Sequence, residues 1–306
     1  MLLAETLRGS RSGVPQQQVV QALEVCESND IYTLHMAQTN NHLLELLNGE
    51  KQERPVLLWI GCSLDRYQIN AMCDLLGGQL DKFYLEGSHG RIAASVICHA
   101  PQITMGYLQI FGMHHKCNKR AANQVDPRSF ETEAVHIRFA LPKLMVRMGE
   151  TPTHVQVGSN LWDLSPECNH QLGVTEQYQE QYVQGIRDIH RVVADLLLAA
   201  QVAWRTGMPV HTLYDAAEPG RKLVNQKVLN DLVQEEVVYG THHYQGITII
   251  GSYLDHWSLV RAAPTDCCML GDGRHYPACS SYAFFNHWLD QVFSTDGGGM
   301  LSEQVL

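Results

Sequence analysis

The sequence Val-Leu-Leu-Trp-Ile-Gly-Cys-Ser-Leu-Asp-Arg-Tyr-Gln, residues 56–68, is the stretch that decides the fold. An apolar run over residues 56–60 ends at Gly61, and Ser63 follows two positions later, where a helix-like segment begins. A near-continuous apolar run is typical of a parallel strand that is buried on both faces. Ligands of open α/β sheets bind outside the carboxyl ends of the strands. The pattern therefore predicts that Ser63 lies at the carboxyl edge of a parallel sheet.

From this strand onward, strand-like and helix-like segments alternate along the chain. The predicted strands cover residues 56–60, 92–99, 103–111, 153–157, 210–214 and 247–252. The predicted helices cover residues 67–76, 131–148, 176–204, 223–238 and 282–292. Such alternation favours an α/β fold with a mostly parallel sheet and helices on both faces. We expect a helical N-terminal extension over residues 1–54, the main domain over residues 55–296 and a short tail over residues 297–306.

The composition argues against several classes of function. The formal net charge of the 306-residue chain is -10 at pH 7, which argues against nucleic-acid binding because that binding depends on Lys and Arg. No apolar run approaches the about 20 residues of a membrane span, and the first 13 residues contain no apolar run of signal-peptide length. The nine cysteines of so long a chain do not indicate a small disulfide scaffold. We therefore expect a cytoplasmic protein with reduced cysteines and without nucleic-acid or membrane partners.

Ser63 has two interpretations. A serine at the turn from a strand into a helix directs its own backbone N–H into the site, and the positive end of the helix favours a developing oxyanion. The same position is also common for a serine that only caps the helix. Taken alone, the pattern favours the cap. The assignment of Ser63 as a nucleophile therefore depends on partners elsewhere in the chain.

A second strand-like segment ends in the sequence V-Q-V-G-S-N-L-W-D, residues 155–163. In a parallel sheet, the carboxyl end of this strand lies at the same edge as Ser63. The amide of Asn160 could there donate a hydrogen bond to a developing oxyanion, without any protonation requirement. An asparagine at this place is equally compatible with an Asx turn.

The third fragment, Asp272-Gly273-Arg274-His275, lies near the C-terminus. Histidine is the usual general base for a serine hydroxyl, and a carboxylate fixes its tautomer. With three residues of separation, one short turn can supply both side chains. The other interpretation is a surface loop, because Asp-Gly is a common turn dipeptide and the chain has 16 histidines. The order of Ser63, Asn160 and this pair along the chain favours the catalytic interpretation.

These motifs resemble, in their order, those of the SGNH, or GDSL, hydrolase superfamily, and they cover most of the chain from residue 56 onward. Within that superfamily the sequence is most similar to the PC-esterase and trichome-birefringence-like branch, whose members carry G-D-S-x-x-R, a W-D pair and D-x-x-H. The counterparts here are G-C-S-L-D-R at residues 61–66, Trp162-Asp163 and residues 272–275. One departure is Cys62, which stands where the branch has an aspartate.

The resemblance implies a three-layer α/β/α fold and ester chemistry. Ser63 would be the nucleophile, His275 the general base and Asp272 the residue that orients the base. The aspartate that Cys62 replaces is not the acid of this triad, so the triad is complete. The oxyanion hole would combine the Ser63 backbone N–H, the Asn160 side chain and a glycine.

The oxyanion glycine of the superfamily has no recognisable motif in this sequence. Gly90 is the first candidate, Gly87 is the second, and Gly112, after the predicted strand over residues 103–111, is a weaker third. Arg66 and Trp162 are candidates for substrate binding. Arg66 could instead cover the helix face with its stem, and Trp162 could pack under the pocket.

We expect no metal and no cofactor. His114, His115 and Cys117, and His242 with His243, could suggest zinc. A zinc site needs four convergent ligands, or three ligands and a water molecule. Because no C-x-x-C pair supports either segment, we interpret both as polar loops.

The sequence therefore favours a serine esterase that hydrolyses an O-acyl ester, in particular an O-acetyl ester, of a small molecule or glycan through an acyl-enzyme. One alternative is an O-acyltransferase with the same triad, in which a sugar hydroxyl replaces water. Another is a catalytically inactive binding or scaffold protein, which Cys62 and the missing glycine motif would suggest. The triad itself does not distinguish hydrolysis from transfer.

Overall fold

The computed structural model describes residues 42–48, 54–87, 92–113, 132–158, 161–168, 170–209, 219–239, 243–244, 247–248, 252–261 and 275–293. Three of the sequence-predicted site residues, Gly90, Asn160 and Asp272, lie outside these ranges. The same is true of most of the predicted N-terminal extension and of the whole predicted tail, so the domain boundaries stay predictions.

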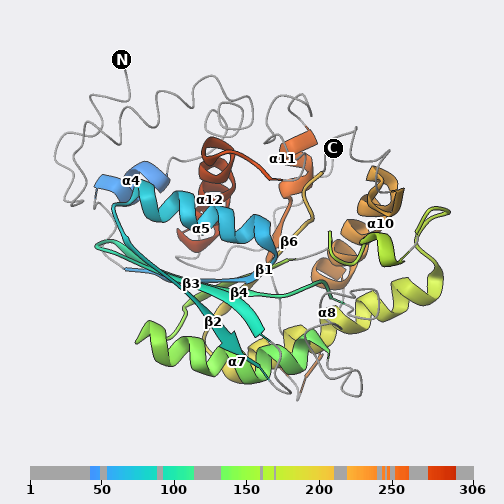
Figure 1. Cartoon of the computed structure of the whole chain (residues 1–306), viewed down its shortest axis with the longest axis horizontal. Coiled ribbons are helices and arrows are strands. Elements are labelled where there is room, and N and C mark those ends of the chain that lie inside the picture. The colour runs from blue at the N-terminus through green and yellow to red at the C-terminus, as the bar shows by residue number, and fades with distance from the viewer. Residues whose placement is uncertain are drawn as a thin grey trace.

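A seven-stranded sheet forms the centre of the described part of the chain (Figure 1). Its strands are β1 (Val56–Gly61), β2 (Gln79–Glu86), β3 (Ile92–Ala100), β4 (Ile103–Gln109), β5 (His154–Gly158), β6 (Gln201–Arg205) and β9 (Ser252–Leu254). The strand order is β2-β3-β4-β1-β5-β6-β9. The strands from β4 to β9 in this order are parallel, whereas β3 runs antiparallel to both of its neighbours. A separate hairpin joins β7 (His243–Tyr244) to β8 (Ile247–Thr248).

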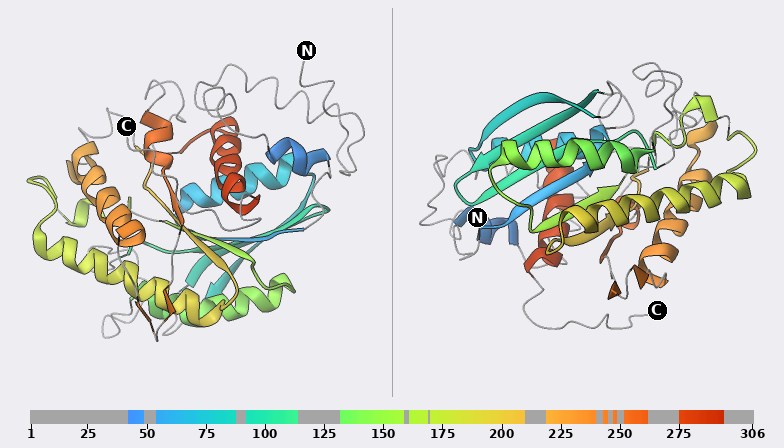
Figure 2. Two further views of the ribbon diagram at one scale, coloured as in Figure 1. Left: turned by 180° about the vertical axis from the view of Figure 1, so that it is seen from behind. Right: turned by 90° about the horizontal axis from the view of Figure 1, so that it is seen from below.

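Helices cover both faces of the sheet, as Figure 2 shows from behind and from below. On one face lie α4 (His42–Asn48), α5 (Ser63–Leu75) and α12 (Ala278–Phe293). On the other face lie α7 (Glu133–Met148), α8 (Glu176–Leu196) and α10 (Leu223–Gln234). The predicted fold class, a three-layer α/β/α sandwich around a mostly parallel sheet, is confirmed.

The central strand β1 is buried along its whole length. Its side chains alternate between the two cores because successive residues of a strand point to opposite faces. Leu58 and Ile60 join the core under α7 and α8, whereas Leu57 and Trp59 join the core under α5 and α12. Both faces therefore need apolar residues, and this need explains the unbroken apolar run in the sequence. The turn after Gly61 consequently lies in the middle of the carboxyl edge.

One prediction of secondary structure is wrong, and one strand was not predicted. The helix predicted over residues 176–204 ends at Leu196, and Gln201–Arg205 form the strand β6. The apolar periodicity continues past Leu196, and no glycine or proline between residues 186 and 206 marks the end of the helix in the sequence. The edge strand β2 was not predicted, because charged residues on its exposed positions hide the strand pattern. The predicted strand over residues 210–214 lies outside the described residues.

The expectation of reduced cysteines is wrong for several described residues. Cys73 of α5 and Cys98 of β3 form a disulfide, and Cys168 and Cys279 are also disulfide-bonded. Disulfides persist mainly in oxidising compartments. They therefore count against the predicted cytoplasmic location. None of the helices in the described ranges is both long enough and apolar enough to cross a bilayer.

Candidate active site

The turn between β1 and α5 places Ser63 at the centre of the carboxyl edge. Cys62 has an extended backbone, and Ser63 is the first residue of α5. The side chain of Ser63 is only partly buried. The orphan N–H groups of the first helical turn give this end of α5 a partial positive charge. A negative charge that develops beside Ser63 would therefore be stabilised.

His275 lies beside Ser63, although the two residues are 212 positions apart in the sequence. The Nε2 atom of His275 is 2.8 Å from the Ser63 Oγ atom, so the hydroxyl can donate a hydrogen bond to an unprotonated Nε2. The next residue, Tyr276, is buried, and its hydroxyl donates to the Pro209 carbonyl over 2.6 Å. This anchor fixes the chain just before α12 and hence the position of the imidazole. Asp272 lies outside the described residues.

A buried ion pair supports the turn that carries Ser63. The Asp65 carboxylate accepts the Cys62 backbone N–H over 2.8 Å. The same carboxylate accepts two hydrogen bonds from Arg205, from Nε to Oδ1 and from Nη2 to Oδ2, each over 2.6 Å. Both side chains are at most 2% exposed. Such a bidentate pair has a defined geometry, so it fixes the backbone just before the proposed nucleophile.

Arg205 also connects three parallel strands at this edge. Its Nη2 donates to the Gly158 carbonyl at the end of β5 over 3.1 Å, and its Nη1 donates to the Thr206 carbonyl after β6 over 2.9 Å. With the bond to Asp65, the guanidinium links the ends of β1, β5 and β6. The predicted oxyanion donor Asn160 lies two residues after Gly158. Arg205 is therefore the physical connection between the Ser63 turn and the start of the Asn160 segment.

Two glycines make room for this ion pair. A Cβ atom on Gly61 would lie within 2.0 Å of the Asp65 Oδ2 atom. A Cβ atom on Gly158 would lie 2.3 Å from Cγ of Arg205. Both distances are shorter than any real contact, and both atoms belong to buried side chains that cannot move away. The glycines at the ends of β1 and β5 are thus required by packing.

Cys62 is a buried thiol beside the ion pair. Burial raises the pKa of Cys62 to about 11, and the negative charge of Asp65 acts in the same direction. The thiol therefore stays protonated at neutral pH and is a poor nucleophile. The Tyr107 hydroxyl donates to the Cys62 carbonyl over 2.8 Å. Asp65, Arg205 and Tyr107 together hold the backbone of the turn at Cys62.

Strand order separates the candidates for the oxyanion glycine. Gly112 follows β4, which pairs with β1, and the Ile110 N–H donates to the Gly61 carbonyl over 2.8 Å. Gly112 therefore lies two residues beyond this contact with the β1 end. Gly87 follows β2, which is three strands away from β1, at roughly 4.8 Å per strand. Gly90 lies outside the described residues. Gly112, the weakest candidate from the sequence, is the best placed of those described.

Asp163 fixes the backbone around Gly112. Its carboxylate is fully buried and accepts the Met113 N–H at 2.9 and 3.0 Å from its two oxygens. The Tyr178 hydroxyl donates to the Asp163 backbone carbonyl over 3.0 Å. Gly112 has a φ of +100°, a conformation that favours glycine, and a Cβ atom there would lie 2.8 Å from the Asp163 carboxylate. The W-D pair thus connects the segments after β4 and β5.

The predicted substrate-binding residues belong to the segments that follow β1 and β5. Arg66 is partly buried on α5, three positions after Ser63 and on the same side of the helix. Within the described ranges its guanidinium makes no hydrogen bond or ion pair, and only its backbone N–H is bonded, to the Cys62 carbonyl over 3.4 Å. Trp162 is partly buried and packs edge-to-face on Phe111, with 5.3 Å between ring centroids. Trp162 also packs against the small apolar cluster that contains Cys62 and Leu64, the two neighbours of Ser63 in the chain.

Metal ligation finds no support in the described residues, which contain no group of three or more His, Cys, Asp or Glu side chains that could hold a metal ion. The predicted polar loops with His114, His115 and Cys117 lie outside those residues, as does His242.

Comparisons with known proteins add little to this geometry. No family model matches the chain, and no curated protein matches it. A lipase/acylhydrolase from Enterococcus faecalis is a structural neighbour with 10% sequence identity and a TM-score of 0.45, over 78% of this chain and 96% of that one. A structure assigned as a platelet activating factor from Streptococcus pneumonia matches with 13% identity and a TM-score of 0.47, over 90% and 99% of the two chains.

Proposed function

We propose that the protein is a serine esterase of the SGNH type. The observation that carries the proposal is the 2.8 Å contact between Ser63 Oγ and His275 Nε2 at the positive end of α5. A serine that only caps a helix has no need of an imidazole on its hydroxyl. A nucleophile and its base within hydrogen-bond reach are the signature of an activated serine. The PC-esterase branch remains part of this proposal and rests on the sequence motifs.

In the proposed mechanism, Ser63 Oγ attacks the ester carbonyl while His275 Nε2 accepts the hydroxyl proton. Asp272 would hold the imidazole in the tautomer that leaves Nε2 unprotonated. The Ser63 and Gly112 N–H groups and the Asn160 amide would stabilise the oxyanion. His275 then protonates the leaving alcohol, and the acyl group stays on Ser63. Water, deprotonated by His275, releases the carboxylic acid and restores the hydroxyl.

The proposed substrate is an O-acyl ester, in particular an O-acetyl ester, of a small molecule or a glycan. The partly exposed ring of Trp162, which packs on the buried Phe111, offers an apolar surface on which a sugar ring or acyl chain can pack. Arg66, a cation without a partner in the described part of the chain, would hold a polar or acidic group of the substrate. An acceptor sugar in place of water would make the same site an acyltransferase, but no contact in the described residues favours that outcome.

Gly112 is expected to be essential for turnover. In Gly112→Ala the N–H group remains, but the new Cβ atom would press on the buried Asp163 carboxylate and displace the turn. We expect kcat for p-nitrophenyl acetate to fall by about 10²–10³-fold, as for the loss of one oxyanion donor. Gly149→Ala is the matched control, because Gly149 also has a positive φ, +72°, but no atom within 4 Å of a Cβ position. It should lose about 1 kcal/mol of stability and no activity. Wild-type kcat in folded Gly112→Ala would remove Gly112 from the site.

A fluorophosphonate probe tests the proposed function directly. Such a probe phosphonylates an activated serine, so the intact folded protein should gain one adduct, located at Ser63 by peptide mass spectrometry. The His275→Ala variant should label at least 100-fold more slowly, because the loss of a general base costs about 10²–10⁴-fold. A known serine esterase labelled in parallel controls the reagent. No adduct on Ser63 while this esterase labels would favour the inactive scaffold.

A further inference from the structure

The ring of Tyr67 stacks on the imidazole of His275. The two ring centroids are 4.3 Å apart, and the planes are tilted by 26°. Tyr67 lies four positions after Ser63 on α5, so the two side chains lie on the same side of the first helical turns. The position of the helix that presents Ser63 to Nε2 therefore also places an aromatic face against the same imidazole.

We propose that Tyr67 is a positioning residue for the general base His275. This inference rests on the proposed esterase function and names a part of its machinery that no catalytic motif includes. Tyr67 is 38% exposed, so neither burial of its own ring nor the filling of a core explains its position. One face of the Tyr67 ring covers the imidazole of His275, and part of the ring is exposed.

Two physical effects follow from the stack. The first is orientation, because a flat ring at 4.3 Å limits rotation of the imidazole about χ2 and keeps Nε2 directed at Ser63 Oγ. The second is electrostatic, because the imidazole gains a positive charge when it accepts the serine proton. The negative face of an aromatic ring attracts a cation, and this attraction is absent before the proton transfers. The stack therefore favours the transition state over the ground state.

The chemistry predicts which variants retain activity. Both effects need the aromatic face of Tyr67 and neither needs its hydroxyl. In Tyr67→Leu we expect kcat for p-nitrophenyl acetate to fall by roughly 10-fold with KM unchanged. The rate of fluorophosphonate labelling at Ser63 should fall by the same factor. Tyr67→Phe should keep both rates within about twofold of wild type. Thermal unfolding of each variant checks the fold.

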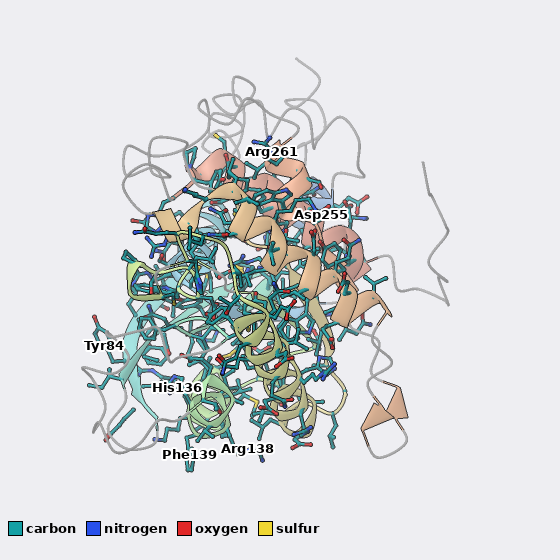
Figure 3. All side chains as sticks on the ribbon, turned by 90° about the vertical axis from the view of Figure 1, so that its right-hand side faces the viewer. Tyr84, His136, Arg138, Phe139, Asp255 and Arg261 are labelled. Atoms are coloured by element: carbon teal, nitrogen blue, oxygen red, sulfur yellow. A yellow bond between two sulfur atoms is a disulfide. The ribbon has the colours of Figure 1, made fainter. Side chains whose placement is uncertain are left out.

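Tyr84→Leu is the matched control. Tyr84 is 76% exposed on the edge strand β2, and Figure 3 shows it at the side of the molecule next to that strand. Loss of this ring should change neither rate. A general effect of removing a surface tyrosine would lower the activity of both Leu variants equally and would overturn the proposal.

The remaining outcomes separate the proposals. If Tyr67→Leu raises KM for long-chain esters but keeps kcat and the labelling rate, the ring contacts substrate and the positioning role is wrong. If wild type is active and Tyr67→Leu retains its full rates, only the Tyr67 inference fails. If wild type neither labels at Ser63 nor hydrolyses an ester, the proposed function fails, and the Tyr67 inference fails with it.

Discussion

Ser63→Ala is expected to abolish ester hydrolysis. Removal of the nucleophile of a serine–histidine pair lowers kcat by about 10⁶-fold in the best-studied cases, because the remaining groups act only through that nucleophile. The same variant should lose the fluorophosphonate adduct completely. Hydrolysis of p-nitrophenyl acetate by purified variant and wild type, at matched concentrations of folded protein, measures the first effect, and intact-mass spectrometry measures the second.

The fold should not change in this variant. The Ser63 side chain is only partly buried, and the backbone of its turn is held by Asp65 and Tyr107 rather than by its own hydroxyl. Ser258→Ala, at an exposed serine of α11 (His256–Arg261), is the matched control and should keep full activity. If Ser63→Ala retained turnover while its thermal unfolding matched wild type, the nucleophile would lie elsewhere.

The layer architecture was predictable because it depends on local patterns. The apolar run of β1 indicates a strand that is buried on both faces, and the apolar stripe of α8 indicates a helix that is buried on one side. The strand β1 lies where the pattern predicts it. The end of α8 was not predictable in the same way. Leu197–Ala200 turn the chain into β6 without glycine or proline, so only pairing of β6 with β5 and β9 ends the helix. Tertiary contacts there override a local periodicity.

The candidate site was predictable to a smaller extent. Ser63 and His275 could be proposed from short motifs, and their side chains lie together in the structure. The pair of Asp65 and Arg205 could not, because Arg205 lies in no recognised motif and Asp65 stands at a variable position of the motif over residues 61–66. The choice of Gly112 over Gly87 needed the strand order, which no local pattern contains. An unexplained acidic residue two positions after the serine was the available signal for Asp65.

Loss of Arg205 is expected to have the largest effect on stability. In Arg205→Met the Asp65 carboxylate would remain in the core without its cation. Breaking one side of a buried ion pair typically destabilises a protein by about 3–5 kcal/mol. Arg187→Met is the matched control, since Arg187 also binds both oxygens of a carboxylate, that of Glu236, at 3.1 and 3.0 Å, but is 47% exposed. It should cost less than about 1 kcal/mol. Urea unfolding of both variants makes the comparison.

A double-variant cycle separates the pair from its surroundings. Asp65→Asn removes the charge but keeps an oxygen that can accept the Cys62 N–H. If the ion pair carries the effect, Asp65→Asn/Arg205→Met should be more stable than the sum of the two single changes predicts, by about 1–3 kcal/mol. In the fraction of each variant that stays folded, Ser63 should label at least 10-fold more slowly, because a small displacement of a reacting group has a large effect on rate. Additive stabilities with wild-type labelling would mean that Arg205 acts only as packing, and that the Ser63 turn holds its position without the guanidinium.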